Sequence, residues 1–120
     1  MTISLSIPGD AAHLAVMRAT VASVAARAHL TLDQVEDVRL AVEEAASTLL
    51  RGEPRAIELS VDPSVQPLEI KVSAQTAHPV TLNPESFSWT ILSAMTEDLD
   101  LRIEAGTTTL TMRFTSPVAG

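Results

Sequence analysis

Hydrophobic and polar residues follow two different periods along the chain, and each period predicts one kind of element. Five short segments alternate apolar and polar residues with a period of two, which is typical of strands that bury one face. They are residues 2–7, 56–61, 68–74, 99–103 and 108–114. Three longer segments repeat apolar residues at spacings of three and four, which is typical of helices. They are residues 10–28, 31–51 and 83 to about 95.

The order of these segments predicts the fold class. Strands that follow one another directly tend to pair antiparallel, and amphipathic helices bury their apolar faces on a sheet. We therefore expect an α/β fold of the α+β two-layer type, with a mostly antiparallel five-stranded sheet and three helices on one face. The opposite face should be solvated and carry short polar side chains. A chain of 120 residues suffices for one hydrophobic core, so we expect a single domain over residues 1–120.

Segment 31–51 is the most clearly defined element. Thr31 and Gln34 have the spacing of a capping box, in which each side chain accepts from the other residue's backbone N–H. Gly52 and Pro54 end the helix. The predicted core stripe comprises Val35, Val38, Val42, Ala45 and Leu49.

The third helix is predicted to begin near Asn83. An asparagine followed by Pro84 and Glu85 combines a cap, a proline at the first helical position and an acid in the first turn. The helix is expected to run to about Met95 or Glu97, and its apolar residues are Phe87, Ile91, Leu92 and Met95.

A polar strip lies beside the core stripe of the central helix. At about 100° per residue, Ala41, Glu44 and Thr48 share one side of the helix, so a carboxylate and a hydroxyl can face a common cleft. Glu43 points away from this strip, toward Glu36 and Ser47. The alternative is a solvated helix flank without a functional role.

Composition and charge exclude several classes of function. The net charge of −7 argues against nucleic-acid binding, which depends on neutralising phosphates. It favours a basic partner, and a solubilising surface explains it equally well. The chain has no cysteine and only three scattered histidines, so no metal site is expected. No apolar run has the length of a membrane span, and the first ten residues do not have the pattern of a signal peptide. We therefore expect a cytoplasmic protein that binds no membrane.

Residues 37–48 carry a family motif. The segment from Ala41 to Thr48, AVEEAAST, resembles the pattern Ala-Val-x-Glu-Ala-x-x-Asn of the anti-sigma-factor branch of the GHKL ATPases, which have the Bergerat, or histidine kinase-like ATPase, fold. The segment Ser86 to Asp98, SFSWTILSAMTED, is similar to a subgroup from high-GC bacteria that antagonises sigma-F-type stress sigma factors.

The resemblance implies ATP and Mg²⁺ as cofactors, with Glu44 as general base and Thr48 at the position of a magnesium-binding asparagine. Three departures argue against both cofactors. Thr48 replaces the amide, residues 74–79 have neither the Asp nor the glycines of the family's adenine motif, and residues 83–89 lack the glycines of its phosphate loop. Phosphate binding by backbone N–H groups needs glycine. We expect Phe87 and Trp89 to fill that space, and we expect no cofactor.

The function implied by the resemblance is that of an anti-sigma factor that sequesters a sigma factor and is released by a STAS-domain anti-anti-sigma protein. An ATP-dependent serine kinase of the STAS partner is the alternative, and a non-regulatory dimeric scaffold is a further one. The resemblance also implies a homodimer. The residues expected to contact a partner are Arg18, Asp33, Glu36, Asp37, Leu40 and Glu43.

Overall fold

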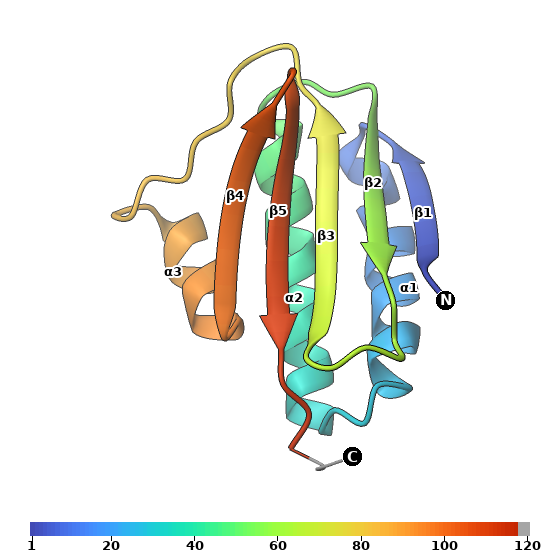
Figure 1. Ribbon diagram of the computed structural model, residues 1–120. Coiled ribbons are helices and arrows are strands. Elements are labelled where there is room, and N and C mark those ends of the chain that lie inside the picture. Colours follow the sequence, from blue (N-terminus) through green and yellow to red (C-terminus); the bar gives the residue numbers. More distant parts are fainter. Residues whose placement is uncertain (118–120) are drawn as a thin grey trace.

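The computed structural model describes residues 1–117, which form one layer of strands and one layer of helices (Figure 1). The strands are β1 (Ile3–Pro8), β2 (Ala56–Val61), β3 (Leu68–Gln75), β4 (Asp98–Glu104) and β5 (Thr107–Phe114). The helices are α1 (Leu14–Ala26), α2 (Leu32–Leu50) and α3 (Phe87–Met95), with a short 3₁₀ turn at Ala11–His13. The predicted elements are confirmed in number, type and order.

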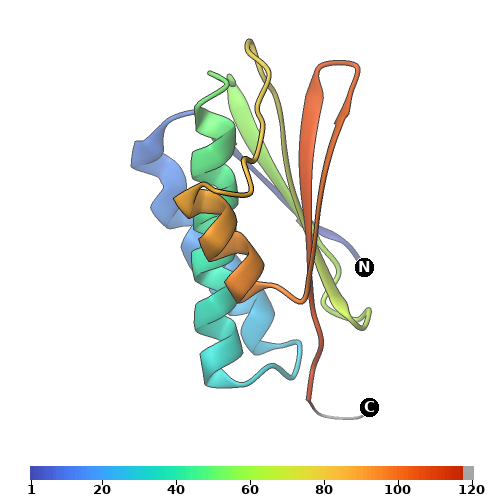
Figure 2. The same cartoon turned by 90° about the vertical axis from the view of Figure 1, so that its left-hand side faces the viewer.

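All five strands pair antiparallel in the order β1-β2-β3-β5-β4. The register places Leu59 opposite Val72 and Val72 opposite Leu110, and these side chains are buried on one face. Figure 2 shows that the helices all lie on that face of the sheet. The predicted α+β two-layer sandwich is therefore confirmed.

The helical layer is built on α2. Its capping box forms as predicted, since the Gln34 backbone N–H donates to Thr31 Oγ1 and the Thr31 backbone N–H donates to Gln34 Oε1. Helices α1 and α2 run antiparallel (Figures 1 and 2) and α3 packs on the other side of α2. Most of the core is aliphatic, as expected for a chain with three aromatic residues.

The start of α3 differs from the prediction. The helix begins at Phe87 and not near Asn83, because Ser86 is its N-cap and accepts a hydrogen bond from the Trp89 backbone N–H at 3.1 Å. Asn83 Oδ1 instead accepts from the Glu85 backbone N–H, which forms a turn before the helix. With this register Phe87 is 78% exposed, so the expectation that its side chain fills the space of the phosphate loop was wrong.

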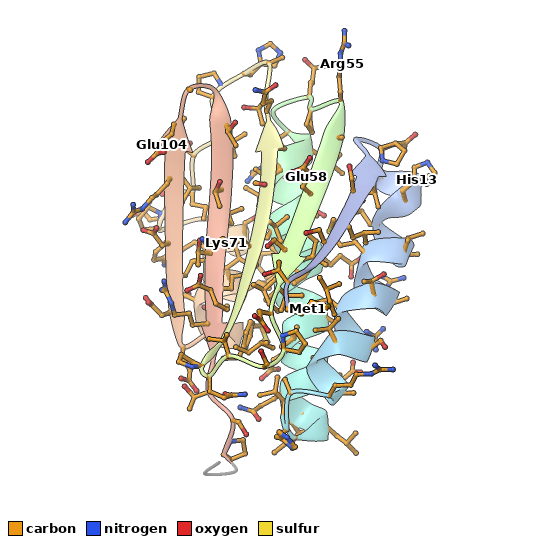
Figure 3. All side chains as sticks on the ribbon, turned by 45° about the vertical axis from the view of Figure 1, so that its right-hand side comes forward. Met1, His13, Arg55, Glu58, Lys71 and Glu104 are labelled. Atoms are coloured by element: carbon orange, nitrogen blue, oxygen red, sulfur yellow. The ribbon has the colours of Figure 1, made fainter. Side chains whose placement is uncertain are left out.

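The open face of the sheet is more charged than predicted. Figure 3 shows this face, with Glu58 and Lys71 labelled. Arg113 donates to Glu69 at 3.0 Å and to Asp98 at 2.5 Å, and the hydrogen bond that it donates to Asp98 raises the pKa of Arg113. A shallow hollow of about 620 Å³ lies beside these pairs. Three acids and three bases line the hollow, so it presents little net charge to a ligand.

Candidate functional site

The polar strip of α2 is mostly buried, and its Glu44 contacts α3. Ala41 is buried, and Thr48 is 1% exposed. The Thr48 hydroxyl donates to the Glu44 backbone carbonyl at 2.8 Å, one helical turn earlier. This common hydrogen bond within a helix satisfies the hydroxyl. Thr48 therefore offers no oxygen to an open cleft.

Glu44 connects two helices. Its carboxylate accepts a hydrogen bond of 2.6 Å from the Ser88 hydroxyl, in the first turn of α3. Hydrogen bonds to a charged acceptor are stronger than neutral ones. The expected cleft shared by Glu44 and Thr48 is thus replaced by a contact between α2 and α3. Sequence reasoning overlooked Ser88; two serines flanking Phe87, one able to cap a helix and one able to reach a neighbouring helix, were the available signal.

The loop after β3 packs closely against the C-terminal end of α2. The Gly52 carbonyl accepts from the backbone N–H groups of Ala77, at 2.7 Å, and His78, at 3.2 Å. A Cβ atom at Gly52 would lie 2.6 Å from Thr76 Cβ and 2.7 Å from a methyl group of Val80, which is buried. The segment that the resemblance compares with the adenine motif therefore covers the end of α2.

These residues do not fit a magnesium nucleotide. Magnesium requires several oxygen ligands in octahedral geometry, whereas the Thr48 hydroxyl is used inside its own helix and the Glu44 carboxylate accepts from Ser88. Thr108 Oγ1 is buried without a hydrogen-bond partner, but one hydroxyl supplies neither a phosphate cradle nor a metal site. Within residues 1–117, no group of three or more His, Asp or Glu side chains is placed to hold a metal ion.

The outer side of α2 carries most of the expected partner-binding residues. Leu40 is 48% exposed, which confirms that it lies off the core stripe, and Asp33 is exposed near the start of the helix. Glu43 accepts from Arg18 of α1 at 2.9 Å, a contact between helices that was not predicted. Glu36 in turn pairs with Arg39 at 2.7 Å.

These two ion pairs reduce the acidic character of the α2 surface. Each pair is partly or largely exposed to water, where such pairs contribute little to stability and are easily exchanged for other partners. Asp33 and Asp37 form no ion pair among those found in the described residues. The acidic surface is thus strongest near the N-terminal end of α2.

Fold and site together describe an α+β two-layer sandwich in which Glu44 and Thr48, the residues compared with a nucleotide site, bond to the chain itself. None of the protein-family models compared with the chain matches it. The chain is similar to the anti-sigma-F factor RsbW of Mycobacterium tuberculosis, in strains CDC 1551 and H37Rv, with 32% identity over 99 residues in both. The match covers 81% of this chain and 59% of each relative, so the chain spans about three fifths of their length.

A solved structure supports the same relationship. The crystal structure of the RsbU and RsbW domains of Rv1364c from Mycobacterium tuberculosis superposes with a TM-score of 0.73, over 96% of this chain and 32% of that one. At 12% identity this likeness shows the fold. The sequence match confirms the resemblance to the anti-sigma-factor branch, and the solved structure confirms the fold.

No helix in residues 1–117 has the length and apolar character needed to cross a membrane.

Proposed function

We propose that this chain is an anti-sigma factor that sequesters an alternative sigma factor of the sigma-F stress type. The observation that carries the proposal is the 32% identity over 99 residues to proteins named anti-sigma-F factor RsbW. Sequestration needs a surface and no chemistry, which agrees with a domain whose Glu44 and Thr48 contact the chain itself.

The proposed contact surface is the outer side of α2 with its neighbour Arg18. Sigma factors carry basic DNA-reading helices, and this chain has a net charge of −7. Opposite charges raise association rates, and salt screens them over about 8–10 Å. Asp33, Glu36, Asp37 and Glu43 would steer the approach, and Leu40 would add an apolar contact. Arg18 would exchange its pairing with Glu43 for the bound partner.

We further propose that release is achieved by a STAS-domain protein without phosphoryl transfer. Transfer rests on positioned phosphates and metal-borne charge neutralisation, and the side chains around Glu44 supply neither. The alternative function, an ATP-dependent serine kinase of the STAS partner, predicts ATP binding in the presence of Mg²⁺. Isothermal titration calorimetry separates the two, and radiolabel transfer to a STAS protein that disappears in Glu44→Ala would establish the kinase.

A homodimer in the cytoplasm completes the proposal. Strand β1 is at an edge of the sheet, as expected, and exposes Ile3 there. Unpaired edges with apolar groups favour association with another chain. Light scattering from micromolar to millimolar concentration tests the dimer, since a constant mass of 12.7 kDa contradicts it. A dimer that binds no sigma factor supports the scaffold alternative.

The decisive experiment is binding to the sigma-F-type sigma factor of the same genome, measured as a function of salt. We expect slower association as salt rises, and also in Glu36→Lys and Glu43→Lys at low salt. Glu58→Lys is the matched control, because it makes the same charge change on the open face of the sheet. Absence of binding by the wild type contradicts the proposed function. Binding with unchanged association rates in both variants places the contact surface elsewhere.

A further inference from the structure

The first turn of α3 exposes an aromatic side chain on an ordered backbone. Phe87 is 78% exposed, whereas the residues beside it are fixed. Ser86 caps the helix through the Trp89 backbone N–H at 3.1 Å, and Ser88 donates to Glu44 of α2 at 2.6 Å. A side chain whose backbone is already ordered loses less entropy on binding than one on a mobile loop.

The exposure of Phe87 is not required by the packing of α3. The helix is held on the core side by Leu92, which is buried, and by the partly buried Met95. Phe87 lies on the opposite side and contributes little to the core. An exposed large apolar side chain indicates function better than a buried one does, because exposed aromatic residues on rigid elements are typical of binding surfaces.

Two carboxylates belong to residues close to Phe87. Glu85 precedes it by two residues, and Glu44 accepts from the neighbouring Ser88. Leu40, which is half exposed, lies one helical turn before Glu44 on α2. The complementary surface would be an apolar pocket with lysine or arginine at its rim.

We propose that Phe87 is the aromatic contact through which this domain binds its sigma factor, inserting into an apolar pocket rimmed by basic residues. The inference rests on the proposed function and adds a contact on α3 to those on α2. Aromatic residues that fill pockets at the centre of an interface contribute most of its binding free energy, whereas charged residues at the rim act chiefly on association rate. Phe87 should therefore govern the dissociation rate.

The test compares three variants for binding to the sigma-F-type sigma factor of the same genome. Phe87→Ala should raise Kd by about 30-fold, mainly through faster dissociation, as for an interface residue of high energetic weight. Phe87→Leu should fall between the wild type and Phe87→Ala. The matched control is Val65→Ala, because Val65 is 50% exposed and lies in the connection between β2 and β3; its Kd should stay within about twofold of the wild type.

Folding and partner identity are measured alongside. Circular dichroism should be unchanged in Phe87→Ala, because alanine favours helix more than phenylalanine does. Hydrogen exchange of the α3 amides should slow when the sigma factor is added to the wild type. Equal Kd values for Phe87→Ala and the wild type overturn the inference and leave the proposed function standing, whereas no binding by the wild type overturns both. Two other results also overturn the inference, because they assign Phe87 to another partner. One is loss of a homodimer in Phe87→Ala. The other is slower exchange of the α3 amides with a STAS protein but not with the sigma factor.

Discussion

Substitution of Gly52 by alanine tests the packing of the loop after β3 on the end of α2. The added Cβ would lie 2.6 Å from Thr76 Cβ and 2.7 Å from a Val80 methyl group, well inside the 3.4–4 Å of ordinary contact. Overpacking of this kind costs about 1–3 kcal/mol. Displacing the loop also weakens two hydrogen bonds to the Gly52 carbonyl, at about 1 kcal/mol each. The lower entropy of the unfolded alanine variant offsets about 0.5 kcal/mol.

We therefore expect Gly52→Ala to lower the free energy of unfolding by about 2–4 kcal/mol, and Tm by about 8–16 °C for a domain of this size. Calorimetry measures the first effect. Hydrogen exchange should show faster exchange at the amides of Ala77 and His78, which donate to Gly52. The matched control is Gly106→Ala, where no atom lies within 4 Å of the new Cβ but φ is +82°; it should cost about 1–2 kcal/mol and leave both amides unchanged.

The reasoning is refuted if Gly52→Ala melts within about 2 °C of the wild type and exchange at Ala77 and His78 stays the same. That result would mean that the loop does not pack on Gly52 in solution. The space at the end of α2 would then be open, and the loop after β3 would no longer exclude a nucleotide from it.

Three further predictions concern single side chains. Ser88→Ala should cost about 1–2 kcal/mol and speed amide exchange in α3, because the Glu44 carboxylate loses its donor; unchanged exchange would contradict the contact. Thr48→Asn should lower Tm without producing ATP binding in calorimetry, because the site is 1% exposed and a larger side chain overpacks it. Hydrogen bonds from the Ser64 hydroxyl and backbone N–H lower the pKa of Asp62 to about 2. This contribution to stability is complete above about pH 4 and is lost as pH falls through about 2. Ser64→Ala should raise the pKa of Asp62 in an NMR titration.

Local signals in the sequence predicted the fold well. Alternating segments gave the five strands, and the capping box of Thr31 and Gln34 fixed the start of α2 to the residue. These features depend on neighbours within four residues, so the sequence contains them directly. The antiparallel order followed from short connections between successive strands. The place of β1 at an edge of the sheet was anticipated and is confirmed.

Competing local signals and tertiary contacts limited the prediction elsewhere. Asn83 and Ser86 are both good caps, and in the structure Ser86 caps α3 while Ser88 donates to Glu44 of α2. That choice of register turns Phe87 outward. The partner of Glu43 was likewise not predictable from the helix alone, because the packing of α1 against α2 places Arg18 within hydrogen-bond distance of it. Contacts between elements distant in sequence are not encoded in local periodicity, so the candidate site was less predictable than the fold.

The hydrogen bonds of Glu44 and Thr48 on α2 affect how a partner switch would operate in this protein. A kinase-type switch inactivates its STAS partner covalently, so that the sigma factor stays bound until the phosphate is removed. Under the proposed function, a domain whose Glu44 accepts from Ser88 and whose Thr48 bonds its own helix has only differential affinity to work with. Release then depends on the concentrations of the two partners and their affinities for overlapping surfaces. A tenfold rise in the concentration of the STAS protein favours its binding over that of the sigma factor by about 1.4 kcal/mol. The abundance of the STAS protein, and not phosphorylation, would then set the response.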